Sequence, residues 1–135
     1  MMKSLLTCFA LILTLPVAAT AQSRSEVRFE PGNYGAMVEG QITGHDYADY
    51  TVAARGGQEL FAEIDVVESD GYGTVYFNIL PPGSDDVAIW IGSTEGDTAR
   101  IELPEDGTYT LRVYQMGNDR DTGATTSFRL DLSIQ

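Results

Sequence analysis

The chain has 135 residues, with 8 basic and 20 acidic side chains and a formal net charge of −12 at pH 7. This balance argues against a nucleic-acid partner, because phosphate recognition requires a basic face. The single cysteine, Cys8, argues against an internal disulfide and against a cysteine-based metal site.

The first 21 residues have the features of a signal peptide. Lys3 supplies the positive start, residues 5–15 are almost continuously apolar, and Ala19-Thr20-Ala21 offers small residues for a signal peptidase. The apolar run is shorter than the ~20 residues that span a bilayer. We therefore expect cleavage after Ala21 and export of residues 22–135 without a membrane anchor. Lys3 is the only charged residue that is lost, so the 114 remaining residues carry seven arginines, 20 acids and a net charge of −13.

Apolar and polar residues alternate with period 2 along most of the remaining chain, which is typical of strands with one buried face. In chain order, strands are expected over 26–30, 36–42, 48–54, 60–66, 75–79, 87–91, 98–103, 108–116 and 128–134. No stretch shows the spacing of an amphipathic helix, so no helix is expected.

Turn residues separate these segments, as in Pro31-Gly32-Asn33, Gly56-Gly57, the run 81–86 and the run 104–107. About eight or nine strands at this spacing predict an all-β fold, an antiparallel β-sandwich. The length of 22–135 corresponds to a single domain, since ~100–150 residues is the commonest domain size.

Residues with catalytic chemistry are sparse. His45 is the only histidine and no G-x-S-x-G nucleophile motif occurs, so we do not expect an enzyme. Asp85-Asp86, with Glu95 and Asp97 nearby, could supply oxygen ligands to calcium, but the D-x-D-x-D-G spacing is absent. Solvated acids in turns are the favoured interpretation, and neither a metal nor another cofactor is expected.

Two stretches carry a resemblance to a known family: VRFEPGNYGAMVEGQITGHDYADYTVAARGGQ and LPEDGTYTLRVYQMGND. Their residues Gly40, Ile42, Gly44, Asp46-Tyr47, Tyr50-Thr51, Arg112-Val113, Gln115 and Asn118-Asp119 fall at the family's spacing. Residues 27–135 thus resemble the bacterial periplasmic inhibitors of g-type (goose-type) lysozyme. The phrases GGQEL, ILPPGSDD and PEDGTYTLRVY also resemble the pre-peptidase C-terminal domain, a β-sandwich appended to secreted enzymes.

The first resemblance implies a periplasmic protein whose partner is a g-type lysozyme. It further implies that loops at one end of the sandwich enter the lysozyme's substrate cleft. The implied binding residues are Tyr47, Asp106, Gly107, Tyr109, Asn118, Asp119 and Arg120. Asp106 stands where the family has serine, and Gly117 and Asp121 stand where arginines are expected. Arg120 is therefore the only basic residue of the loop 117–126.

Several alternatives stay open at this point. The polar segment 117–126 is longer than a strand connection requires, so we expect a functional loop there. Tyr109 shares the parity of Leu111 and Val113, which favours a place in the core with its hydroxyl bonded at a corner over direct contact. Trp90 is likewise expected in the core. The second resemblance would instead make the protein a non-catalytic module that binds carbohydrate or calcium. The acidity serves either solubility or attraction of a basic partner, and the oligomeric state, monomer or weak dimer, is open.

Overall fold

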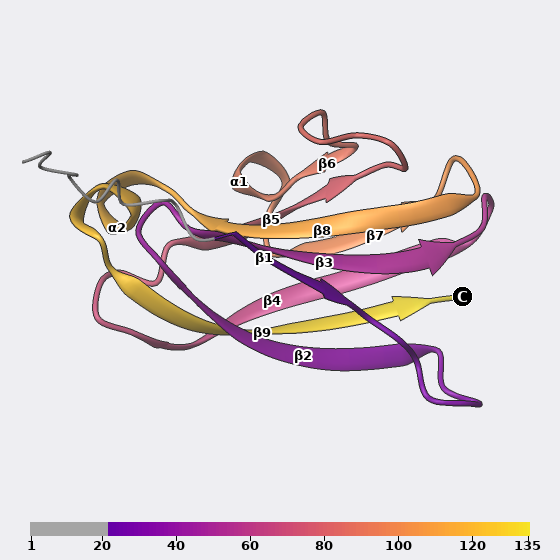
Figure 1. Cartoon of the computed structure of the whole chain (residues 1–135), viewed down its shortest axis with the longest axis horizontal. Helices are drawn as coiled ribbons and strands as arrows, with labels where there is room; N and C mark the ends of the chain where they lie inside the picture. The colour runs from indigo at the N-terminus through magenta and orange to yellow at the C-terminus, as the bar shows by residue number, and fades with distance from the viewer. Residues whose placement is uncertain (1–21) are drawn as a thin grey trace, which may run out of the picture.

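A computed structural model describes residues 22–135; the expected signal peptide lies outside the described residues. Two sheets pack face to face (Figure 1). Sheet A has the strand order β1 (Gln22–Glu26), β3 (Tyr47–Ala54), β8 (Gly107–Gln115), β5 (Val75–Leu80), β6 (Trp90–Ile91). Sheet B has the order β2 (Gly35–Thr43), β9 (Thr125–Ile134), β4 (Glu59–Ser69), β7 (Thr98–Glu102). The predicted all-β sandwich is confirmed.

The core lies between the sheets and follows the alternation in the sequence. Tyr109, Leu111 and Val113 of β8 are fully buried, and they belong to the same buried cluster as Phe128 and Leu130 of β9. Burying an apolar side chain of this size stabilises the fold by about 1.5–3 kcal/mol. The intervening residues of both strands point outwards, so each sheet has one face in the core and one towards solvent.

The first strand differs from the sequence prediction in place and direction. A strand was expected over 26–30, but β1 covers Gln22–Glu26 and pairs parallel with β3, with Gln22 opposite Tyr47. All five of its residues are exposed, so the sequence QSRSE carries no alternation to reveal it. The chain then turns Val27 into the core, where its N–H donates to the carbonyl of Thr51 at 2.7 Å. One parallel pair therefore lies in an otherwise antiparallel sandwich.

The segment after β5 also departs from the prediction. Instead of a strand over 87–91, the structure has the two-residue β6 followed by a short helix, α1 (Gly92–Glu95). The carboxylate of Glu95 accepts the N–H of Ile91 at 2.7 Å, and the side chain of Asn78 accepts the N–H of Gly92 at 3.2 Å. These bonds turn the chain away from the sheet. Trp90 was expected in the core; it is partly buried and packs against the core.

The strand directions separate two ends of the sandwich (Figure 1). The turn 44–46, the loop 70–74 and a second helix, α2 (Gly117–Thr122), lie at one end, which we call the α2 end. The turns 55–58 and 103–106 lie at the other. Because β8 connects the two ends with nine residues, they are separated by roughly 30 Å.

Candidate functional site

Helix α2 occupies the segment that was expected to be a polar loop. Residues 117–122 are helical, and β9 begins at Thr125. Gly117 and Gly123 adopt positive φ angles of 64° and 76°, which turn the chain into and out of the helix. The hydroxyl of Thr122 donates to the carbonyl of Asn118 at 2.7 Å. The expectation of a chain without helices was therefore wrong, and most of the expected loop 117–126 is helical; its role in function stays a prediction.

Asp119 joins α2 to the loop 70–74. Its side chain is 1% exposed, and its two carboxylate oxygens accept the N–H of Tyr72 at 2.9 Å and the N–H of Thr74 at 2.7 Å. These donors favour the ionised form and hold the pKa of Asp119 below its ordinary value. Asp119 was expected on the binding surface, but its carboxylate is directed inwards to the neighbouring loop.

The turn 44–46 packs against the end of the same helix. The N–H of Gly44 donates to the carbonyl of Ala124 at 2.9 Å. Gly44 has a φ of 56°, and a Cβ at this position would lie 3.3 Å from the Cα of Gly123. A residue without a side chain is therefore favoured here, and the three segments of the α2 end are held against one another.

Several polar and aromatic groups remain exposed on this end. Asn118 and Asp121 are exposed on α2, and Arg120 is 40% exposed with its Nε 3.0 Å from the carboxylate of Asp121. Tyr72 of the loop 70–74 is 82% exposed. A shallow polar hollow between helix and loop is lined by Asp70, Gly71, Tyr72, Asn118, Thr122, Gly123 and Ala124. No feature of the sequence points to Tyr72, because the position of its loop depends on the distant Asp119.

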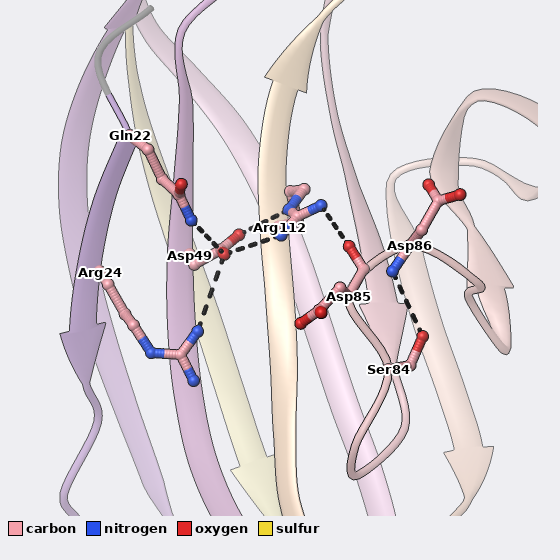
Figure 2. Close-up of polar contacts among 7 residues, drawn as sticks. All are labelled: Gln22, Arg24, Asp49, Ser84, Asp85, Asp86 and Arg112. Atoms are coloured by element: carbon pink, nitrogen blue, oxygen red, sulfur yellow. Dashed lines mark hydrogen bonds and ion pairs between the residues drawn. The ribbon is translucent and has the colours of Figure 1, made fainter.

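Tyr47 is the first residue of β3 and lies beside a charged network on the outer face of sheet A. The guanidinium carbon of Arg112 is 4.4 Å from the centre of the Tyr47 ring, close enough for a cation–π contact. Arg112 also donates two hydrogen bonds to Asp49, at 2.8 and 3.0 Å, and one to the carbonyl of Asp85 at 2.9 Å (Figure 2). The bond to Asp49 raises the pKa of Arg112 above its ordinary value.

The strand β1 closes this network from the other side. Asp49 is 1% exposed although it lies on the outer face, because Gln22 and Arg24 cover it. The amide nitrogen of Gln22 lies 3.4 Å from its carboxylate, and a guanidinium nitrogen of Arg24 lies 3.9 Å away. The ring of Tyr47 thus rests on an arginine whose direction is fixed by a buried carboxylate.

Three of the residues expected in the site lie at the opposite end and make contacts within the fold. Tyr109 is fully buried, and its hydroxyl donates to the carbonyl of Glu105 at 2.6 Å and accepts the N–H of Glu105 at 3.1 Å. The carboxylate of Asp106 accepts the N–H of Gly56 at 2.8 Å. Gly107 has a φ of 145°, and a Cβ there would lie 2.7 Å from the ring of Pro82.

The seven residues therefore do not form one cluster. Tyr47, Asn118, Asp119 and Arg120 lie at the α2 end, and Asp106, Gly107 and Tyr109 lie at the other. Polar residues on either side of β8 were predicted to bind the enzyme. The sequence could not show that the two groups lie at opposite ends of that strand.

Neither a cluster of metal-ligating side chains nor a membrane-spanning helix is found among residues 22–135. No three His, Cys, Asp or Glu side chains in this part of the chain converge on a point that could hold a metal ion. His45 lies exposed in the turn 44–46. No helix within the same residues has the length and apolar character needed to cross a bilayer.

Comparisons with known proteins agree on one family. No protein-family profile matches the sequence. The chain is 32% identical over 136 residues to an inhibitor of g-type lysozyme from Escherichia coli strain K12, and the match covers 98% of each protein. The crystal structure of Aeromonas hydrophila PliG, a periplasmic inhibitor of g-type lysozyme, matches with a TM-score of 0.75 and 30% identity, over 84% of this chain and 97% of that one.

Two further solved structures are similar to this chain. A mutant of the Escherichia coli periplasmic inhibitor matches with a TM-score of 0.66 and 29% identity, over 85% of this chain and 100% of that one. The pre-peptidase C-terminal domain of a Bacillus anthracis collagenase matches with a TM-score of 0.54 at 15% identity, over 89% of this chain and 100% of that one, which shows a shared fold. Both resemblances seen in the sequence are confirmed. The chain belongs to the family of inhibitors of g-type lysozyme, which are inhibitory and not catalytic proteins.

Proposed function

We propose that this protein is a periplasmic inhibitor of g-type lysozyme and that its α2 end occludes the substrate cleft of the enzyme. The proposed target rests on the similarity to an inhibitor of g-type lysozyme over 98% of both proteins. The periplasmic location follows the relatives that are described as periplasmic. It also agrees with the signal-peptide features of residues 1–21.

The groups exposed at the α2 end match what a glycosidase cleft offers. Such a cleft contains paired carboxylates and hydrogen-bonding groups that are arranged for sugar. Arg120 provides a charge-assisted donor and Asn118 an amide, while Tyr47 provides an aromatic ring. A guanidinium opposite a cleft carboxylate makes the strongest of these contacts.

The opposite end is a weaker candidate, because Tyr109 is fully buried and the hydrogen bonds of Asp106 and Tyr109 hold the turns there, whereas Arg120 pairs with Asp121 between two solvent-exposed side chains. The carboxylate of Asp106 holds the N–H of Gly56, and the hydroxyl of Tyr109 is bonded to Glu105. Contact with an enzyme through these groups would first require those hydrogen bonds to break.

The α2 end is also preorganised. Asp119 fixes the loop 70–74 to the helix, and Gly44 fixes the turn 44–46 to Ala124. Segments that are ordered before binding lose less conformational entropy when the complex forms. The net charge of −13 on residues 22–135 adds long-range attraction for a basic enzyme, which raises the association rate.

An assay of residues 22–135 against g-, c- and i-type lysozymes, side by side on a cell-wall substrate, tests the target. The proposal expects inhibition of the g-type enzyme and none of the other two at equal concentration. Absence of inhibition of any g-type lysozyme at micromolar protein would reject it. Titration with calcium and with soluble glycans would then test the alternative of a non-catalytic binding module.

The proposed processing has its own measurement. Intact mass of the protein recovered from a periplasmic extract should correspond to a chain that begins at Gln22. Recovery of a protein that retains residues 1–21 would contradict cleavage after Ala21.

A further inference from the structure

The loop 70–74 presents an aromatic ring that the fold does not use. Tyr72 is 82% exposed, the largest exposed fraction among the large apolar and aromatic side chains of residues 22–135. A single exposed aromatic residue needs no explanation by itself. The features that distinguish Tyr72 are the way its backbone is held and the place where the loop lies.

The backbone on both sides of the ring is fixed by hydrogen bonds from distant segments. The carboxylate of Asp119 accepts the N–H of Tyr72 and the N–H of Thr74, at 2.9 and 2.7 Å. Asp70 is bonded twice to Thr125, through its N–H to the carbonyl at 3.2 Å and through its carboxylate to the N–H at 2.8 Å. The loop is therefore braced against α2 and β9 while its aromatic side chain remains in solvent.

Glycines on either side allow this close approach. A Cβ at Gly71 would overlap the carboxylate of Asp119, and Gly73 has a φ of 72° that favours glycine. The sequence Gly71-Tyr72-Gly73 thus combines two glycines that allow the backbone to lie against Asp119 with one large ring that remains in solvent.

The loop 70–74 lies beside the groups of α2 that are proposed to contact the enzyme. Tyr72 and Asn118 both line the polar hollow between loop and helix, and Thr122 completes the wall on the helix side. A partner surface that contacts Asn118 therefore lies within reach of the Tyr72 ring.

From these observations we propose that Tyr72 is a lysozyme-contacting residue, the tip of a second projecting segment beside α2. This inference rests on the proposed function. The ring fits the saccharide-binding surface of the cleft, where it can stack on apolar groups and offer its hydroxyl to polar ones. Tyrosine is enriched at the centres of protein interfaces because it gives a large contact area with few rotatable bonds. Asp119 acts as the positioning residue, because it fixes the backbone that carries the ring.

The matched control is Tyr34, which is 67% exposed at the opposite end, directly before β2. The variants Tyr72→Ala and Tyr34→Ala each remove one exposed ring without leaving a buried cavity. Both should keep the melting temperature of the parent protein. Tyr72→Ala should weaken inhibition of g-type lysozyme by about tenfold or more, as expected for a central aromatic contact. Tyr34→Ala should leave inhibition within about twofold, since residues outside an interface contribute little.

The conservative variant separates the ring from other effects. Tyr72→Phe should retain most of the inhibition that Tyr72→Ala loses; equal losses in the two variants would reject stacking of the ring. If the parent protein inhibits and Tyr72→Ala inhibits as well as Tyr34→Ala does, this inference falls and the proposed function stands. If the parent protein neither binds nor inhibits a g-type lysozyme, the proposed function falls and takes the role of Tyr72 with it.

Discussion

The carboxylate of Asp119 accepts the backbone N–H of Tyr72 at 2.9 Å across 47 positions in the sequence. A second N–H, that of Thr74, donates to the same carboxylate at 2.7 Å. One side chain therefore joins the helix α2 to the loop 70–74, and both hydrogen bonds favour its ionised form.

Asp119→Asn tests this dependence through pH. Because the pKa of Asp119 is lowered in the folded protein, its contribution to stability is complete above the unfolded value of ~3.9 and is lost as pH falls through the lower folded value. Asparagine cannot accept both N–H groups equally, so the variant should melt at a lower temperature at pH 7. The difference from the parent should shrink as pH falls from about 4, where Asp119 of the unfolded chain takes up a proton, through the lower pKa of the folded state.

Asp121→Asn is the control for this experiment, since Asp121 lies exposed on the same helix. Its melting temperature should follow that of the parent protein between pH 2 and pH 7. A difference between the parent and Asp119→Asn that stays constant with pH would show that the carboxylate charge has no part in holding the loop.

Arg112→Ala should destabilise the fold strongly although Arg112 lies on the outer face of its sheet. Asp49 is 1% exposed and would lose its bidentate partner. Removing one partner of a buried pair costs on the order of 3 kcal/mol. Arg100→Ala breaks an exposed pair with Glu59 and should cost less than about 1 kcal/mol. Chemical denaturation of both variants measures the contrast, and equal costs would mean that the Asp49 network adds no stability.

Tyr109→Phe distinguishes a corner tyrosine from a contact residue. The hydroxyl of Tyr109 bonds both the carbonyl and the N–H of Glu105. Its loss removes the partner of both backbone groups of Glu105 and should cost about 0.5–1.5 kcal/mol in the free energy of unfolding, the net contribution of an ordinary hydrogen bond. Inhibition of lysozyme by the folded variant should be unchanged. Weaker inhibition with full stability would place Tyr109 in the interface and contradict the structural role.

Only part of the fold could be predicted from the sequence. Alternation predicted the long strands, because a residue buried between two sheets must be apolar and its neighbour must not; β8 with Leu111 and Val113 is the clearest case. Helix α2 was missed because six polar residues are too short to show a periodicity. A helix of that length is also unstable alone and depends here on Asp119 and its distant loop. β1 was misplaced because an exposed edge strand needs no alternation.

The candidate site, too, could be predicted only in part. Tyr47, Asn118 and Arg120 were chosen by a resemblance and by polarity, and they lie at one end. Asp106 and Gly107 are close to Asn118 and Arg120 in the sequence but far from them in space, since β8 separates them. Arg112 and Tyr72 could not be assigned from sequence, because their environment is made by Asp49 and Asp119 on other elements.

Inhibition should weaken as salt is added. Residues 22–135 carry a net charge of −13, and attraction between exposed charges is screened beyond a Debye length of ~8 Å at physiological ionic strength. Stopped-flow association rates with a basic g-type lysozyme should therefore fall with salt more steeply than dissociation rates rise. An association rate that does not change between low and high salt would mean that the acidity has no part in recognition.

If the α2 end, and not the opposite end, enters the enzyme, substitution of one arginine at each end should have very different effects on inhibition. Arg120 lies on α2, and Arg55 is exposed in the turn 55–58 at the other end. Arg120→Ala and Arg55→Ala change the net charge equally, so long-range attraction is matched, and both should keep stability within about 0.5 kcal/mol. The inhibition constant against g-type lysozyme should rise by about 5- to 30-fold for Arg120→Ala, the range of one desolvated charge contact, and stay unchanged for Arg55→Ala. The reverse result, or equal effects from both variants, would mean that the α2 end is not the part of the protein that enters the cleft.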